Sequence, residues 1–177
     1  MKAIFDLLAQ HRLPMLIIGG HALTAHGVQR LTFDVDCLVA TADFDALSQL
    51  LIRGGFTNVQ HQQNFSAFNH VTPGVPKVDV MRVDATTFAK IEAARKAWDF
   101  GNKRFAVPAL EHLIALKLHA MKNNPERAGK DGWDIAALLA ANPGAIPREK
   151  LRELCERFGP PDVHPTFSKN DDTPPQP

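Results

Sequence analysis

Two aspartates stand two positions apart in the segment Asp34-Val35-Asp36. Alternate residues of a β-strand point to the same face, so a strand over residues 33–39 would hold both carboxylates side by side. Such a pair suits a hard divalent cation, because Mg²⁺ commonly takes one or two protein carboxylates together with substrate phosphates. The spacing predicts that Asp34 and Asp36 bind Mg²⁺ or Mn²⁺. The alternative, two solvated acids on a strand edge, is disfavoured by the apolar residues on either side.

A third carboxylate, Asp79, lies in Lys77-Val78-Asp79-Val80-Met81. The apolar neighbours predict a buried strand, in which an unpaired carboxylate would be costly. Together with the first two aspartates it could complete a two-metal centre, whose cations activate an attacking hydroxyl and neutralise a leaving pyrophosphate. A second interpretation stays open, in which Asp79 forms a buried ion pair with Lys77 or Arg82.

A glycine pair precedes the first two aspartates. Gly19 and Gly20 follow an apolar run at 15–18, which predicts a buried strand ending at a glycine turn, and a short helix closed by Gly27 comes next. Backbone N–H groups at such a turn can approach phosphates closely. Combined with the Asp-x-Asp segment, the pair predicts phosphate binding. Arg30 could orient a phosphate, and a solvated loop arginine is the alternative.

The remaining pattern predicts a mixed α/β (α+β) fold without the regular alternation of a doubly wound sheet. We expect strands at 15–18, 33–39, 58–61, 65–71, 77–83 and 105–107, and helices at 2–10, 22–26, 41–53, 87–97, 108–122, 131–141 and 147–158. These give one domain over residues 1–159, with a mixed sheet core at about 14–107 and a helical cap at about 108–158. The Pro-rich segment 160–177 is expected to be a flexible tail.

Bulk composition excludes several classes of protein. The chain has 177 residues, 45% of them hydrophobic, which is enough for one core, and its net charge of +1 gives no global attraction to nucleic acid or membrane. Apolar stretches are too short to span a bilayer and no signal peptide is recognisable, so we expect a cytoplasmic protein. Cys37 and Cys155 have no CxxC spacing, and we expect neither a disulfide nor a zinc site.

Two further sets of residues imitate functional motifs. Asp43-Phe44-Asp45 repeats the Asp-x-Asp spacing, but it stands where a helix begins, and helix capping explains it better. The histidines match neither a metalloprotease helix nor a zinc finger, so we interpret them as packing or polar surface residues; they are His21, His26, His112 and His119.

The segments Leu16-Ile17-Ile18-Gly19-Gly20-His21-Ala22 and Arg30-Leu31-Thr32-Phe33-Asp34-Val35-Asp36 together resemble the signature of the DNA polymerase beta-like nucleotidyltransferase superfamily. Within it they are most similar to the AbiEii/AbiGii-like branch. The stretch 113–120 with Arg127, Lys130-Asp131 and Asp134-Ile135 is similar to that branch's helical Lys and Lys-Asp elements. The resemblance covers roughly residues 15–140, and its specificity comes from the combination of motifs.

This resemblance implies a nucleotidyltransferase fold and transfer of a nucleoside monophosphate from an NTP to an acceptor hydroxyl. It implies that Asp34 and Asp36 bind metal and that Asp79 binds metal or acts as base. The implied nucleotide- and phosphate-binding residues are Gly19, Gly20, Arg30, Thr32, Lys117 and Asp131. Alternatives remain at two of them, since Lys117 could be a helix lysine with a solvated head and Asp131 a helix-start charge. The chain departs from many members in having Gly20 in place of serine.

The resemblance also implies partners. Some members are toxins that act on tRNA in abortive-infection systems, so we expect an NTP, a tRNA or other RNA acceptor and an antitoxin-like protein, with no membrane. The small size leaves little room for an acceptor-binding domain, which favours a homodimer or a second hypothesis. In that hypothesis the chain is a catalytically quiet module that binds a nucleotide or a partner. The three intact aspartates favour the enzyme.

Overall fold

The computed structural model describes residues 2–11, 13–161, 163 and 167. Within them the chain forms two compact units. The first takes in the described residues up to Ala25 and those from Gln29 to Ala109, and the second takes in His26–Val28 and the described residues from Leu110 onward.

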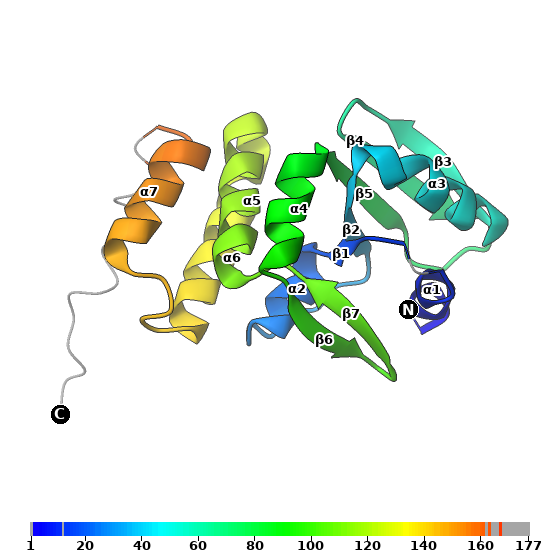
Figure 1. Cartoon of the computed structure of the whole chain (residues 1–177), viewed down its shortest axis with the longest axis horizontal. Helices are drawn as coiled ribbons and strands as arrows, with labels where there is room; N and C mark the ends of the chain where they lie inside the picture. Colours follow the sequence, from blue (N-terminus) through cyan, green and yellow to red (C-terminus); the bar gives the residue numbers. More distant parts are fainter. Residues whose placement is uncertain (1, 12, 162, 164–166, 168–177) are drawn as a thin grey trace. The chain divides into compact units, whose positions relative to one another are not determined.

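The first unit carries the sheet. Its elements are α1 (Lys2–Ala9), β1 (Leu16–Ile17), α2 (Gly19–Ala25), β2 (Val35–Ala40), the 3₁₀ turn η1 (Thr41–Asp43), α3 (Phe44–Arg53), β3 (Phe56–His61), β4 (Phe65–His70), β5 (Val78–Val83), α4 (Ala85–Ala93), β6 (Lys96–Phe100) and β7 (Lys103–Val107) (Figure 1). Five strands form one sheet in the order β1-β2-β5-β4-β3. The pair β2 and β5 is parallel and the other pairs are antiparallel, which confirms the predicted mixed sheet.

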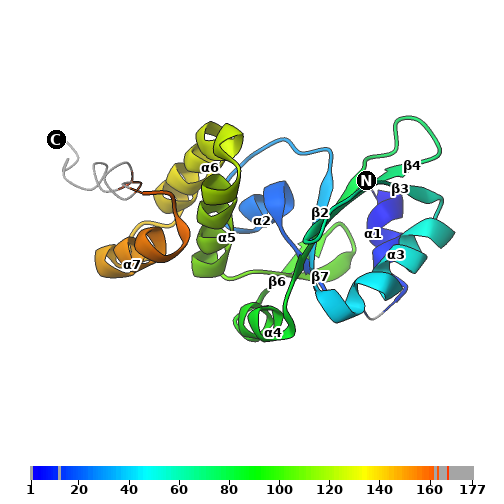
Figure 2. The ribbon, with the colours of Figure 1, turned by 90° about the horizontal axis from the view of Figure 1, so that it is seen from above.

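The core of this unit fixes its central strands. Val35, Cys37 and Val39 of β2 and Val78 and Val80 of β5 are all fully buried. Helices α2 and α4 contact β2, while α3 contacts β3 and α1 contacts α3. In Figure 2, α1 and α3 lie on one side of these strands and α2 and α4 lie on the other. Because each buried branched side chain contributes about 1.5–3 kcal/mol, β2 and β5 are held in one register relative to each other.

The second unit is helical. It consists of α5 (Leu110–Asn123), the 3₁₀ turn η2 (Pro125–Arg127), α6 (Ala128–Ala141) and α7 (Arg148–Phe158), and α5 contacts both other long helices (Figure 1). Its core is made by apolar side chains on the facing sides of these helices, among them Leu113, Ile114, Leu118, Ile135 and Leu138. Val163 and Phe167, from the predicted tail, are also buried. Most of the predicted tail lies outside the described residues.

The main error in the predicted elements concerns residues 87–97. Helix α4 ends at Ala93, and residues 96–100 form β6, which pairs with β7 in a hairpin of its own. The turn of this hairpin contains Gly101 with a positive φ of 66°. Pairing with β7 outweighs the helical tendency of this short segment, because a period of 3.6 or of 2 is hard to distinguish over so few residues.

Smaller differences affect element ends. Strand β2 begins at Val35, after the first of the paired aspartates, and α2 already begins at Gly19. Gly27 has a φ of 86°, which confirms the predicted left-handed residue after that helix. Among the described residues, no helix combines the length and the apolar character that crossing a bilayer requires.

The two cysteines are free and buried. Burial, helped by the charge of Glu156, raises the pKa of Cys155 to about 11. Burial also raises the pKa of Cys37, and the carboxylates of Asp36 and Asp79 raise it further. Both thiols therefore stay protonated at neutral pH and are poor nucleophiles.

Candidate active site

Three aspartates, Asp34, Asp36 and Asp79, meet where β2 and β5 lie side by side, and we call them the acidic cluster. Asp36 and Asp79 are partners in the register of the two parallel strands. One step earlier, the N–H of Val35 donates to the carbonyl oxygen of Lys77 at 3.1 Å, which fixes the segment before β5 beside the segment before β2. The predicted gathering of the three carboxylates on neighbouring strands is therefore what the register produces.

Lys77 stands within this cluster. Its Nζ lies 2.7 Å from Oδ2 of Asp79 and 3.6 Å from Oδ2 of Asp34. Burial lowers the pKa of Lys77, but the hydrogen bond to Asp79 and the charges of the three aspartates outweigh burial and raise it above its ordinary value. The ion pair considered from the sequence is thus present, with Lys77 as the partner of Asp79.

Arg82, the other predicted partner of Asp79, binds backbone carbonyl groups outside the acidic cluster. It is buried, and its guanidinium donates to the carbonyl oxygens of Gln62, Gln63 and Phe65. The same group lies 4.0 Å from the centre of the Phe44 ring. Arg82 therefore stabilises the turn between β3 and β4 rather than the acidic cluster.

The glycine turn packs directly against the cluster. Gly19 has a φ of 60°, and a Cβ placed on it would lie 2.0 Å from Oδ2 of Asp36. The N–H of Ile18 donates to the carbonyl oxygen of Asp36 at 2.9 Å, so the end of β1 and the start of β2 are joined at this point. Position 19 therefore needs glycine for two independent reasons, its backbone conformation and its distance from the carboxylate.

Glycine at position 20 avoids a collision with a different residue, Thr32. A Cβ placed on it would lie 2.6 Å from Cβ of Thr32 and 2.7 Å from its Oγ1. The hydroxyl of Thr32 donates to the carbonyl oxygen of Asp34 at 3.3 Å, so Thr32 also shapes the segment that leads to the cluster. Any side chain at this position, a serine included, would collide with Thr32, which explains the glycine here. Arg30 lies half-buried in the same segment, and its contact with phosphate stays a prediction.

Lys117 and Asp131 lie in the helical unit, where they form a buried ion cluster. Nζ of Lys117 lies 3.0 Å from Oδ1 of Asp131 and 2.5 Å from Oδ2 of Asp134, and both aspartates are fully buried. Nε of Arg127 lies 2.9 Å from the second oxygen of Asp131. The head of Lys117 is therefore not solvated, and Asp131 is more than a helix-start charge. Their predicted roles toward phosphate stay predictions.

Two opposing effects act on the pKa of Asp131 in this buried ion cluster. Burial tends to raise the pKa, but hydrogen bonds and charge from Arg127 and Lys117 outweigh it, so the pKa lies below its ordinary value. Asp131 is thus ionised in the folded protein. Sequence reasoning missed the shared use of Lys117 by two aspartates. Its only signal was the spacing of Asp131 and Asp134, which places both on one face of a helix.

His21 is a packing residue, as predicted. Its ring meets the edges or faces of Phe5 and Phe100 at centroid distances of 5.2 and 5.3 Å. Burial lowers the pKa of His21, and its Nε2 has no hydrogen-bond partner. Asp43 stands at the N-cap position of α3 without a side-chain capping hydrogen bond, so the predicted capping role is only positional.

Whether the acidic cluster can bind a divalent cation depends on its ligand atoms and on the charge beside them. No group of three or more His, Cys, Asp or Glu side chains in the part of the chain that the structure describes is arranged to hold a metal ion by itself. At the acidic cluster, the Lys77 ammonium lies 3.6 Å from Oδ2 of Asp34 and 2.7 Å from Oδ2 of Asp79. Oδ1 of Asp79, however, is buried without a hydrogen-bond partner. The donors are hard oxygens, which fit Mg²⁺ when substrate phosphates supply the remaining ligands.

Comparison with known proteins places the chain among nucleotidyl transferases. The family model described as "Nucleotidyl transferase AbiEii toxin, Type IV TA system" matches residues 3–175. No curated protein sequence matches the chain.

Solved structures share the fold. The crystal structure of ANT(2")-Ia in complex with adenylyl-2"-tobramycin has a TM-score of 0.67 at 14% identity, covering 89% of this chain and 93% of that one. The lincomycin-bound lincosamide antibiotic adenylyltransferase LnuA has a TM-score of 0.58 at 13% identity, covering 80% and 97%. An antigenic nucleotidyltransferase-like protein from Paracoccidioides brasiliensis has a TM-score of 0.54 at 19% identity, covering 94% and 91%. These matches confirm the nucleotidyltransferase fold.

Proposed function

We propose, from the premise that the chain belongs to the AbiEii nucleotidyl transferase toxin family, that it moves a nucleoside monophosphate from an NTP to an acceptor hydroxyl at the acidic cluster. The observation that carries this proposal is the register of β2 and β5, which sets Asp36 beside Asp79. The close approach of Gly19 to Asp36 supports it, since it brings the backbone of the glycine turn against that carboxylate, and backbone N–H groups at such turns can bind phosphates.

In the proposed mechanism, Asp34 and Asp36 would hold a divalent cation, Mg²⁺ or Mn²⁺, and such a cation would supply charge neutralisation at the phosphates. The backbone of Gly19 and Gly20 cradles the phosphates, and Arg30 and Thr32 contribute to binding the nucleotide. The acceptor oxygen forms a bond to the α-phosphorus while the bond to pyrophosphate breaks. Oδ1 of Asp79, which is buried and has no hydrogen-bond partner, accepts the hydroxyl proton. Positioning and charge neutralisation supply most of the rate in such transfers.

A hydroxyl of tRNA is the acceptor that we propose, because some members of the branch that the motifs resemble act on tRNA. Two of the structural neighbours were solved with adenylyl-2"-tobramycin and with lincomycin. Small molecules that carry hydroxyl groups are therefore tested as alternative acceptors. The family description also supports an antitoxin partner. A homodimer and a cytoplasmic location stay expectations.

The test incubates the protein with Mg²⁺ and each of the four NTPs, labelled at either the α- or the γ-phosphate, in the presence of purified tRNA, total RNA or small hydroxyl compounds. Label from the α-position, but not from the γ-position, is expected in an acceptor, which separates nucleotidyl transfer from phosphoryl transfer. Absence of α-label from every acceptor would contradict the proposal. If an NTP nevertheless raised the melting temperature, the protein would be a nucleotide-binding module.

A further inference from the structure

Lys77 is a positive charge built into the acidic cluster. Its Nζ bridges Asp79 and Asp34, at 2.7 Å and 3.6 Å from their Oδ2 atoms. The side chain of Lys77 is 41% exposed, whereas that of Asp79 is 13% exposed, so the ammonium reaches the cluster from its solvent side. Like charges on neighbouring strand positions repel one another. An ammonium among them therefore stabilises the arrangement when no metal is bound.

We propose that Lys77 takes the place of the cation in the metal-free protein and moves to the triphosphate when the cation enters. This inference rests on the proposed nucleotidyl transfer, and it adds a reason why the site would bind metal well only together with its nucleotide. Lys77 is in this account a positioning residue, since it acts through Asp34, Asp79 and the phosphates.

The physical argument is one of charge. A divalent cation held by Asp34 and Asp36 would repel an ammonium that lies 3.6 Å from Oδ2 of Asp34. The four-carbon stem of Lys77 is flexible, so its head can leave Asp79 without movement of the backbone. That backbone is held in place by the hydrogen bond from the N–H of Val35. The anions nearest to the released ammonium are then the phosphates that arrive with the cation.

This exchange predicts two effects of opposite sign for one substitution. Without Lys77, a cation alone meets no competitor and binds more tightly. A cation already complexed with triphosphate loses a contact with its phosphates and binds more weakly. A lysine that served only to hold the fold together would, when removed, weaken both kinds of binding or change neither. Opposite signs therefore distinguish a lysine that acts on both the cation and the phosphates from one that only holds the fold together.

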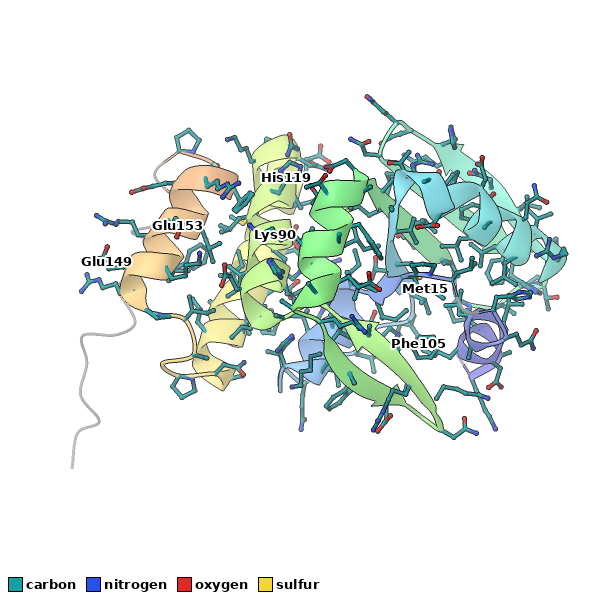
Figure 3. All side chains as sticks on the ribbon, in the orientation of Figure 1. Met15, Lys90, Phe105, His119, Glu149 and Glu153 are labelled. Atoms are coloured by element: carbon teal, nitrogen blue, oxygen red, sulfur yellow. The ribbon has the colours of Figure 1, made fainter. Side chains whose placement is uncertain are left out.

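The experiment compares the wild type with Lys77→Met by isothermal titration calorimetry, using MnCl₂ alone and then preformed Mn²⁺–triphosphate. Inorganic triphosphate is the probe because it contains the part that all NTPs share. We expect Lys77→Met to bind Mn²⁺ alone about fivefold more tightly and Mn²⁺–triphosphate about fivefold more weakly, which is the lower end of ordinary coupling between two ligands. Lys90→Met is the matched control, since Lys90 is an exposed lysine on α4 of the same unit (Figure 3).

Two outcomes would overturn the inference: both affinities unchanged, or both shifted in the same direction. An equal response of Lys90→Met would overturn it too, because net charge alone would then explain the result. Circular dichroism checks that each variant is folded. Lys77→Gln, which can still donate to Asp79, replaces Lys77→Met if the latter is unfolded. Opposite shifts without any NMP transfer by the wild type would support the role of Lys77 while rejecting the proposed function.

Discussion

Asp36 and Asp79 are direct partners across the parallel pair β2 and β5, although 43 positions separate them in the chain. The pairing depends on valines that flank each aspartate and are fully buried, including Val35, Val78 and Val80. A slip of one residue in either strand would turn one carboxylate to the opposite face. The core thus sets the geometry of the acidic cluster, and the predictions below follow from this geometry.

Gly19→Ala is expected to reduce nucleotidyl transfer strongly. The new Cβ would meet the carboxylate of Asp36 at 2.0 Å and would sit on a backbone with a φ of 60°. We expect activity to fall about 10²-fold or more, since a shift of about 1 Å in an active site has this effect. Label transfer measures the loss. The control is Gly74→Ala, where φ is also positive, at 82°, but no atom lies within 4 Å. Equal losses in both variants would contradict the contact with Asp36.

Lys117→Met is expected to destabilise the helical unit. The substitution leaves the fully buried Asp134 and Asp131 without the ammonium that lies 2.5 and 3.0 Å from them. Removing one partner of a buried ion pair costs about 3–5 kcal/mol of the free energy of unfolding. Urea denaturation followed by circular dichroism measures it. Lys122→Met, on an exposed position of the same helix, should change stability by less than about 0.5 kcal/mol. A small effect at Lys117 would show that the buried aspartates find other partners.

The stability of the wild type should fall at acid pH partly through Asp131. Its folded-state pKa lies below the ordinary value of 3.8, because Arg127 and Lys117 outweigh the effect of burial. A carboxyl group of this kind contributes stability that is complete above the unfolded pKa and is lost as pH falls through the folded pKa. The gap in unfolding free energy between wild type and Asp131→Asn should therefore be constant from pH 7 to about pH 5 and should narrow below about pH 3.8. A gap that does not change with pH would refute the assignment.

The sequence predicts the acidic cluster because its signals are local. Asp34, Asp36 and the glycine turn lie within a short segment, and alternation along a strand is enough to place two carboxylates on one face. Asp79 required a register between strands, which sequence alone could not fix, although its apolar neighbours located the strand. The ion pair with Lys77 was considered, but its bridging position between Asp34 and Asp79 depends on the pairing of segments that are distant in sequence.

Other features depend on contacts between residues that are distant in the sequence. The sequence pattern predicts residues 96 and 97, the start of β6, as the end of a helix, because only pairing with β7 makes residues 96–100 extended. The collision that requires glycine at position 20 comes from Thr32, whose approach is visible only in the folded chain. The sequence leaves a solvated Lys117 as an alternative, since nothing in its own helix shows that two buried aspartates of the next helix surround it.

The most direct test of the central claim is transfer of α-label from an NTP by Asp36→Asn, compared with Asp43→Asn. The two substitutions remove the same charge from two similar Asp-x-Asp segments. Asp36 faces Gly19 and Asp79, whereas Asp43 stands at the start of α3. The account predicts loss of transfer by Asp36→Asn, at least about 10²-fold as for other preorganised charge-stabilising groups, with wild-type transfer by Asp43→Asn. Wild-type transfer by a folded Asp36→Asn would contradict it.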